Sequence, residues 1–260
     1  MTRNYQQFKS ISVFLPAYNE EANIEKAVKE AKNALERIFD DFEIIVINDG
    51  STDRTGQISD QLAKSDPVIQ VVCHPKNLGY GVALKSGFKK SSKDLVFFTD
   101  ADLQYDFREL KKFLENISDF DAVIGYRRRR ESIFRSFNAL GWRTLIGNLF
   151  GTHFRDIDCA FKLFRRSSLR DLNLGSTGAA VSAELLVKLT LKGYKIKELP
   201  VNFRRRIFGQ ATGGNIKVIL RAFRELFIFY ENYRRLPAAA SAAAHAAAGR
   251  TAAAKAGKSR

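Results

Sequence analysis

The first half of the chain alternates short apolar runs with longer stretches in which apolar residues recur every three or four positions. The short runs predict buried strands, and the longer periodic stretches predict helices with one apolar face. Their alternation predicts a mainly parallel sheet covered by helices. The predicted strands are 11–15, 42–48, 69–73, 95–99 and 122–125, and the predicted helices are 22–39, 54–63, 79–91 and 107–116.

The second half of the chain is less regular. We expect a helix within 127–151, a second helix over 182–192, a strand over 195–202 and a last helix over 215–236. The last helix has the pattern of a helix that lies in a membrane interface, because cations stand beside an apolar side. The alternative is that the apolar side packs on the domain while the cations are solvated. The apolar residues are Ile216, Ile219, Leu220, Phe223, Phe227 and Tyr230, and the cations are Lys217, Arg221 and Arg224.

Composition excludes several classes of protein. Cys73 and Cys159 are far apart and the chain has three histidines, so no zinc or iron–sulfur spacing is present and a reducing compartment is expected. Neither a signal peptide nor an apolar run of about 18 residues is visible. The segment after Pro237 is rich in alanine and is expected to be a disordered tail, native or introduced by cloning.

The net charge of +15 predicts a polyanionic partner, such as nucleotide phosphates, nucleic acid or an anionic membrane. The tail adds only four of these cations, so the folded part is itself basic. We expect no nucleic-acid partner, because the aromatic residues are scattered and no nucleic-acid-binding signature is present.

Two carboxylates, Asp100 and Asp102, directly follow the predicted strand 95–99. They leave the end of a buried strand close together, where a cation or a donor must compensate them. Oxygen ligands of this kind suit Mg²⁺ or Mn²⁺, which also bind substrate phosphates. The alternative is that Asp100 begins a turn and Asp102 caps the helix that starts near Phe107.

Similar polar loops follow the first two predicted strands, as Pro16-Ala17-Tyr18-Asn19-Glu20-Glu21 and Asn48-Asp49-Gly50-Ser51-Thr52-Asp53. Each alone is compatible with a helix cap or a turn. Ligands of parallel sheets bind beyond the carboxyl ends of the strands, so the recurrence favours one shared crevice.

These three motifs, in this order and at these spacings, resemble the family-2 inverting glycosyltransferases of the GT-A fold, in particular the polyprenyl-phosphate (dolichol-phosphate) mannose or glucose synthases. The resemblance implies an α/β, Rossmann-like GT-A fold with a mixed, mainly parallel sheet flanked by helices and a C-terminal amphipathic helix. It divides the chain into a glycosyltransferase domain over 1–214, a membrane-interface helix over 215–236 and the tail over 237–260.

The resemblance also assigns the donor side. Asp49 is expected to accept hydrogen bonds from the base, and Asp102 to bind the cation directly. Arg206 and Gln210 resemble a mobile loop that closes over the donor phosphates, although Ala211-Thr212 departs from the family pattern. The expected nucleotide-site residues are Pro16, Ala17, Tyr18, Glu20, Asp49, Asp53 and Asp100, and the expected metal set is Asp100, Asp102 and Gln104.

The acceptor side follows partly from chemistry. A sugar hydroxyl must lose a proton as it attacks, whereas a phosphate monoester is already anionic near neutral pH and requires a cationic cradle instead. Arg127 matches the family's acceptor-phosphate arginine, with Arg135 and Arg143 as further candidates. For Arg128, Arg129 and Arg130 a solvated charge run or a nucleic-acid patch is favoured, and contact with lipid headgroups is the alternative.

Further residues are assigned by resemblance alone. Asp102, Arg127 and Asp156 are the expected catalytic residues, and Asp156, Asp158, Phe161 and Lys162 resemble a block that lines the sugar pocket. Glu184 occupies the region where relatives that use a hydroxyl acceptor hold a base, although an ordinary polar position on a helix explains it equally well.

The expected activity is inverting transfer of a hexose, with mannose favoured, from GDP-mannose or UDP-glucose to a polyprenyl phosphate, with Mg²⁺ or Mn²⁺. The alternative acceptor is a glycan hydroxyl. The expected partners are the polyprenyl-phosphate lipid and an anionic membrane surface, which the protein would bind peripherally from the cytoplasmic side. The oligomeric state and any further transmembrane helices stay open.

Overall fold

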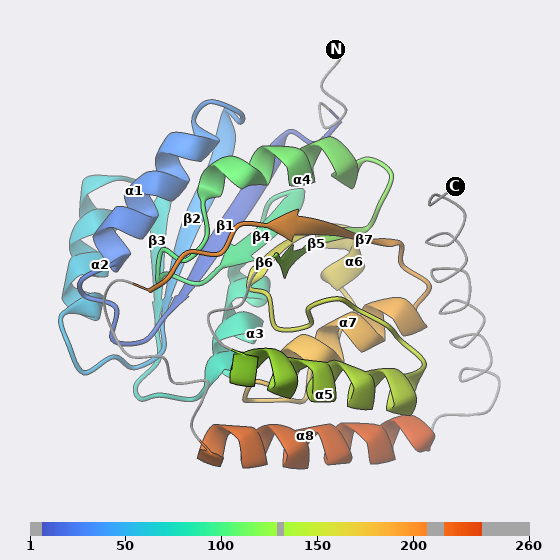
Figure 1. The fold of residues 1–260 in the computed structure, drawn as a ribbon. Coiled ribbons are helices and arrows are strands. Elements are labelled where there is room, and N and C mark those ends of the chain that lie inside the picture. Colours follow the sequence, from blue (N-terminus) through green and yellow to red (C-terminus); the bar gives the residue numbers. More distant parts are fainter. Residues whose placement is uncertain (1–6, 129–132, 207–215, 236–260) are drawn as a thin grey trace.

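A computed structural model describes residues 7–128, 133–206 and 216–235, and in it seven strands form one sheet (Figure 1). The sheet order is β3-β2-β1-β4-β6-β5-β7, and only β6 runs antiparallel to its neighbours. The expected mixed, mainly parallel sheet is thus confirmed. The strands are β1 (Ser10–Ala17), β2 (Asp41–Asn48), β3 (Ile69–Cys73), β4 (Leu95–Thr99), β5 (Ala122–Arg127), β6 (Phe161–Arg165) and β7 (Ile196–Val201).

Helices cover both faces of the sheet. In Figure 1, α1 and α4 lie on one face, and α3 and α7 lie on the other. Each helix buries its apolar positions; α4, for example, buries Leu110, Phe113, Leu114 and Ile117. The helices are α1 (Ile24–Leu35), α2 (Thr55–Ser65), α3 (Tyr80–Lys90), α4 (Leu110–Ile117) after a 3₁₀ turn (Phe107–Glu109), α5 (Ile133–Phe150), α6 (Arg166–Leu169), α7 (Val181–Leu191) and α8 (Ile216–Arg234).

Strand β6 was not predicted from the sequence. Its second residue is Lys162, which is fully buried, and a lysine interrupts the apolar run by which a buried strand is recognised. The strand inserts between β4 and β5, with Lys162 beside Phe98 and Ile124. Because β6 is antiparallel to both, β4 and β5 point the same way and end at the same edge of the sheet.

A second, smaller core joins α5, α7 and α8 outside the main sheet. Trp142 of α5 packs edge-on against Phe223 of α8, and Phe150 stacks on Phe229 with centroids 4.9 Å apart. The two helices lie side by side at the bottom of Figure 1. Leu226 and Tyr233 bind α8 to this core.

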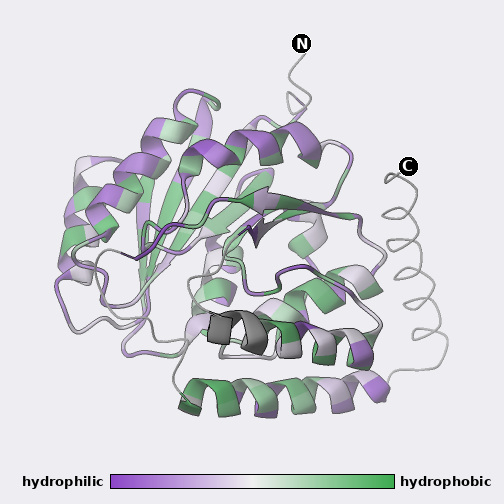
Figure 2. Ribbon diagram, viewed as in Figure 1, coloured by the Kyte–Doolittle hydropathy of each residue, from purple (hydrophilic) through white to green (hydrophobic). Residues whose placement is uncertain are grey.

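Helix α8 nevertheless exposes a second set of apolar side chains. Figure 2 shows hydrophobic colour along much of this outermost helix. The exposed residues are Ile216, Leu220, Phe223, Phe227 and Ile228. Leu140 of α5 is also an exposed large apolar residue. The apolar side predicted from the sequence therefore does not simply pack on the domain. In the described part of the chain, no helix combines the length and hydrophobicity needed to cross a bilayer.

Candidate active site

The loops that follow β1 and β2 interlock through reciprocal hydrogen bonds. Asn19 adopts a left-handed conformation (φ 56°), its amide donates to Ser51 Oγ, and its side-chain oxygen accepts from the Thr52 amide at 2.8 Å. Asparagine tolerates this conformation better than most residues. The interlock fixes one wall of the crevice at the carboxyl ends of the strands.

Asp53 shapes this wall by capping a helix. Asp53 Oδ1 accepts from the Thr55 amide at 2.9 Å and from the Thr55 hydroxyl, and Oδ2 accepts from the Glu21 amide at 3.1 Å. Burial would raise the pKa of Asp53, but the bonds from Thr55 outweigh it and lower the pKa. Its expected contact with the nucleotide stays a prediction.

Backbone bonds join the three strand ends beside this wall. The Pro16 carbonyl accepts from the Ala101 amide, and the Ala17 carbonyl accepts from the Asp49 amide at 2.9 Å. Tyr18 follows them with a relative exposure of 36%, which leaves its ring available to a planar base. The ends of β1, β2 and β4 are therefore joined, and the place of Pro16, Ala17 and Tyr18 in the nucleotide site stays a prediction.

Asp49 is buried and already accepts three hydrogen bonds. Its Oδ1 accepts from His74 Nδ1 at 2.6 Å and from the Leu78 amide at 3.0 Å, and its Oδ2 accepts from the Gly79 amide at 2.9 Å. His74 Nε2 in turn lies 2.9 Å from Ser86 Oγ. A carboxylate offers about four lone-pair directions, so one direction on Oδ2 remains.

Two acidic side chains, Glu20 and Asp102, share one guanidinium. Arg206 Nη2 donates to Glu20 Oε1, and Arg206 Nη1 lies 3.8 Å from Asp102 Oδ2. Burial raises the pKa of Glu20 even though Asn23 and Arg206 both act to lower it. The predicted closing arginine therefore lies in the acidic crevice.

Asp100 is the most perturbed carboxyl group of the crevice. Burial and the nearby Asp102 raise the pKa of Asp100 to about 7. Tyr80 donates its hydroxyl hydrogen bond to Asp100 Oδ1 at 3.1 Å, and burial raises the pKa of this phenol well above its ordinary value. Two carboxylates that disfavour each other's ionisation are suited to a divalent cation, which removes that cost.

The oxygen donors fit Mg²⁺ or Mn²⁺, which use one or two carboxylates and complete their shell with water and substrate phosphate. Within 7–128, 133–206 and 216–235, no cluster of three or more His, Cys, Asp or Glu side chains is arranged to hold a metal ion. Gln104 donates from Nε2 to the Arg204 carbonyl at 3.0 Å, so this nitrogen fastens the loop to residue 204. A direct role for Gln104 as a metal ligand stays a prediction.

At the end of β5, where the acceptor side is expected, Arg127 is held by the carboxylate of Asp156. Arg127 Nε and Nη2 donate to Asp156 Oδ2 and Oδ1 at 2.6 and 2.8 Å, and the Phe203 ring lies 5.3 Å from the guanidinium carbon. Burial would lower the pKa of Arg127, but Asp156 outweighs it and raises the pKa. Asp156 therefore orients Arg127, and the geometry gives it no role as an independent base.

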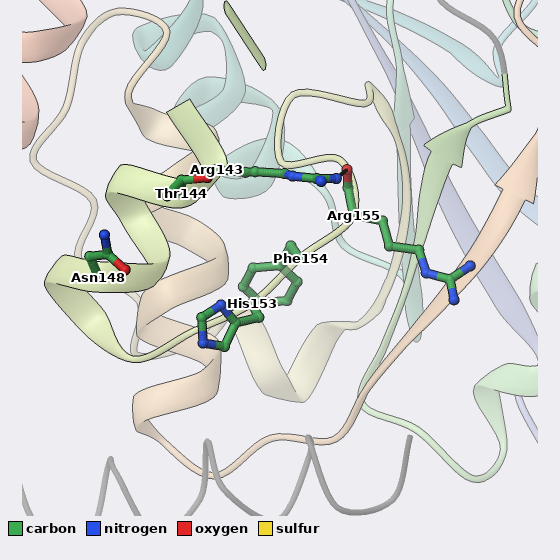
Figure 3. A pocket seen from close by; sticks show the side chains of 6 residues that line it. All are labelled: Arg143, Thr144, Asn148, His153, Phe154 and Arg155. Atoms are coloured by element: carbon green, nitrogen blue, oxygen red, sulfur yellow. Dashed lines mark hydrogen bonds between the residues drawn. The ribbon is translucent and has the colours of Figure 1, made fainter. Parts of the chain in front are cut away.

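Of the other two predicted acceptor arginines, only Arg143 has a side chain that the structure describes. Arg135 lies on α5, where the structure describes the helix but not this side chain, and Gln210 falls outside the described residues. Arg143 reaches toward Arg155 and lines a separate cavity of about 310 Å³ (Figure 3). The cavity wall is basic and has no carboxylate: Arg143, Thr144, Asn148, His153, Phe154 and Arg155.

Lys162 and Glu184 are both held by hydrogen bonds to nearby backbone groups. Lys162 Nζ donates to the Ile157 and Cys159 carbonyls, and burial lowers its pKa. Glu184 accepts from the Gly175 and Ser176 amides and from Lys188 Nζ. Lys162 therefore holds the segment 157–159 in place, and the sugar-pocket role of this block stays a prediction. Glu184 has the ordinary structural role that was its alternative.

Two polar partners of the site, His74 and Tyr80, were not predicted from the sequence. The signal near Tyr80 was the pair Gly79 and Gly81, which indicates a close approach of backbone. His74 directly follows β3 at the same sheet edge as Asp49, but nothing in its neighbourhood identified the pairing.

Comparison with solved structures defines the fold family. Glucosyl-3-phosphoglycerate synthase from Mycobacterium tuberculosis, in complex with Mn²⁺, UDP and phosphoglyceric acid, superposes with a TM-score of 0.69 at 21% identity. The match covers 88% of this chain and 81% of the other. The fold is thus GT-A, as expected.

Three curated relatives share parts of their length with this chain. Glycosyltransferase AglD of Haloferax volcanii is 33% identical over 74% of this chain and 33% of its own. Dolichyl-phosphate beta-glucosyltransferase ALG5A of Trichomonas vaginalis is 34% identical over 74% of this chain and 65% of its own. An undecaprenyl-phosphate 4-deoxy-4-formamido-L-arabinose transferase of Photorhabdus laumondii is 26% identical over 83% and 66%. The chain therefore spans between one third and about two thirds of these relatives.

A family-wide comparison gives the assignment. The model described as Glycosyl transferase family 2 matches residues 12–172. This span is more than half of the chain and includes all three strand-end motifs as well as Arg127 and Asp156. The protein belongs to glycosyl transferase family 2.

Proposed function

We propose that this protein transfers a hexose from a nucleoside diphosphate sugar to a polyprenyl phosphate, with inversion at the anomeric carbon. The observation that supports it most is the placement of Asp100 and Asp102 after β4 and of Arg127 at the end of β5. The two strands end at one sheet edge with β6 between them, so about 10 Å separates them at ordinary strand spacing. A sugar fits between a pyrophosphate at the carboxylates and a phosphate at the arginine.

The two carboxylates considered as general bases are already paired, which favours a phosphate acceptor over a hydroxyl acceptor. Asp156 is paired with Arg127 through both oxygens, and Glu184 is occupied by two amides and a lysine. A phosphate oxygen forms its bond to the anomeric carbon while the bond to the nucleoside diphosphate breaks, and no proton has to leave the nucleophile. This step requires a cationic cradle, which Arg127 provides.

The donor pyrophosphate would be held by Arg206 together with the carboxylate pair. Asp100 and Asp102 would hold Mg²⁺ or Mn²⁺, which would supply charge neutralisation for the departing diphosphate. Arg206 lies between Glu20 and Asp102, from which it needs only a side-chain movement to reach an incoming phosphate. Tyr80 keeps Asp100 in place while the donor binds.

We propose uracil as the base of the donor nucleotide, because Asp49 can accept only one further hydrogen bond. One remaining direction on Oδ2 suits the single ring N–H of uracil, whereas guanine presents two adjacent donors. Two relatives are named dolichyl-phosphate beta-glucosyltransferases, and these names support glucose as the first sugar to test. The sequence-based preference for mannose stays a prediction.

We also propose that α8 and α5 lie against an anionic membrane surface. The exposed apolar residues of α8 stand beside Arg221 and Arg224, and the basic cavity of α5 is suited to a phosphate headgroup. The cytoplasmic side of the membrane and the lack of a nucleic-acid partner stay predictions.

The test is a transfer assay with mass spectrometry of the extracted lipid. The protein is incubated with UDP-glucose or GDP-mannose, undecaprenyl phosphate in anionic vesicles, and Mn²⁺ or Mg²⁺. We expect one added hexose on the lipid phosphate with UDP-glucose and Mn²⁺. Hydrolysis of the donor without lipid product, with either donor and either metal, would contradict the proposal.

A further inference from the structure

Two carboxylates from different helices accept hydrogen bonds from four consecutive backbone amides, 175–178, in the loop before α7. Glu184 of α7 accepts from the Gly175 and Ser176 amides at 2.8 and 2.7 Å. Glu225 of α8 accepts from the Thr177 amide at 3.2 Å and from the Gly178 amide at 3.0 Å. The loop conformation is therefore set in part by the outermost helix of the molecule.

The side chain of Thr177 strengthens this attachment. Its hydroxyl donates to Glu225 Oε1 at 2.8 Å and accepts from Arg221 Nη2 at 2.6 Å. Arg221 Nε also donates to Glu225 Oε1 at 3.1 Å, so Arg221, Glu225 and Thr177 form a closed triangle. The Glu225 side chain is only 12% exposed, which protects these bonds from water.

The loop 175–178 packs directly against the start of α3. The Thr177 carbonyl accepts from the Gly81 amide at 2.9 Å. A Cβ at Gly79 would lie 2.6 Å from the Thr177 carbonyl oxygen, and a Cβ at Gly81 would lie 2.7 Å from the Ser176 carbonyl oxygen. Both glycines are thus required by the close approach of the loop, and Gly79 also has a φ of 102°.

Residues 78–80, at the start of α3, reach both carboxylates that are predicted to bind the donor. The Gly79 amide donates to Asp49 Oδ2, and the Tyr80 hydroxyl donates to Asp100 Oδ1. The Leu78 amide donates to Asp49 Oδ1. A displacement of Gly79-Tyr80-Gly81 would therefore move both Asp49, which is proposed to bind the nucleotide base, and Asp100, which is proposed to bind the metal.

We propose that Glu225 and Arg221 are positioning residues for the donor site, acting through Thr177 and Gly81 on Asp49 and Asp100. This inference rests on the proposed function, since it assigns Asp49 and Asp100 to the donor. It makes α8 more than a lipid-facing helix, because one side of α8 exposes Phe223 and Phe227 while another holds the loop that orders the nucleotide site. In Figure 1 the first turns of α8 lie beneath the start of α3.

The experiment compares Glu225→Gln with Glu231→Gln in the whole chain. Both are on α8, but the one ion pair of Glu231 among the described residues is with Arg234, at 3.9 Å. Hydrogen exchange is measured on the amides of residues 78–81, and UDP binding with Mn²⁺ is measured by calorimetry. We expect Glu225→Gln to speed exchange at these amides about tenfold and to weaken UDP binding about tenfold, with no change in Glu231→Gln.

A second pair of variants separates positioning from general loss of structure. Thr177→Val removes the hydroxyl from the triangle, whereas Thr177→Ser keeps it. We expect Thr177→Val to raise the donor KM about fivefold with the lipid KM unchanged, and Thr177→Ser to restore the donor KM. If Glu225→Gln does not fold, Arg221→Gln replaces it, because that side chain is 48% exposed.

Two negative results have different meanings. Unchanged exchange at residues 78–81 in folded Glu225→Gln or Arg221→Gln overturns the positioning role, whatever the ligand. Wild-type protein that binds neither UDP nor GDP overturns the proposed function, while the exchange measurement still decides whether α8 orders this segment.

Discussion

The donor and acceptor sides of the crevice balance their charges in opposite ways. On the proposed donor side, Glu20 and Asp102 share the guanidinium of Arg206, and the pKa values of Glu20 and Asp100 are raised. On the acceptor side, Arg127 has a dedicated partner in Asp156. The donor side therefore gains stability when it takes up a cation, whereas the acceptor side holds its cation in place before any ligand arrives.

The largest effect is expected from Asp102→Asn, which removes half of the carboxylate pair on the donor side. We expect transfer to fall about 1000-fold, because the charge on the leaving diphosphate loses its compensation. The control is Asp60→Asn on the exposed surface of α2. Residual turnover above a tenth of wild type would show that the pair does not act in the reaction.

On the acceptor side, Arg127→Lys keeps the charge but loses the bidentate bond to Asp156. We expect the lipid kcat/KM to fall about 100-fold with UDP affinity unchanged, since a misplaced cation no longer cradles the phosphate. Steady-state kinetics with varied lipid measure this, and the exposed Arg170→Gln is the control. An equal loss in UDP affinity would mean that Arg127 belongs to the donor side.

The pKa of Asp100 predicts a pH-dependent cost on the donor side in metal-free protein. Because burial and Asp102 raise this pKa from 3.8 to about 7, the folded state binds more protons than the unfolded state between these values. The contribution of Asp100 to stability is therefore favourable at low pH and is lost as pH rises through 7.

Asp100→Asn tests this dependence. We expect the variant to be more stable than wild type by on the order of 2 kcal/mol at pH 8, with the gap closing toward pH 5. Urea unfolding in EDTA across this range measures it. A gap that does not change with pH would remove the charge imbalance proposed for the donor side.

The smallest effect is expected at the membrane surface. Phe227→Ser replaces an exposed ring on α8, and we expect about tenfold weaker binding to anionic vesicles with the donor KM unchanged. Flotation with neutral vesicles is the control. Undiminished binding to anionic vesicles would show that this face of α8 does not contact lipid.

Much of the fold was predictable, because strands buried on both faces and amphipathic helices leave clear periodic patterns. Strand β4 matches the predicted range 95–99, and α8 begins and ends within two residues of its predicted bounds. Strand β6 was missed because buried Lys162 is compensated by carbonyls of a preceding loop, and such tertiary compensation has no local signal.

The site was predictable in its residue types but not in its pairings. The positions of Asp49, Asp102 and Arg127 followed from strand ends. Their partners did not, since Asp49 meets His74 across 25 residues and Arg127 meets Asp156 across 29 residues. Sheet order brings these groups together, and periodicity along the chain does not specify sheet order uniquely.

A paired acceptor assay decides whether the acceptor is a phosphate. Undecaprenyl phosphate and undecaprenol are supplied in identical anionic vesicles with UDP-glucose and Mn²⁺, and glucosylated lipid is quantified for each. We expect product from the phosphate alone, with a β-linked sugar phosphate from an α-linked donor. Transfer to the free alcohol at a comparable rate would contradict it.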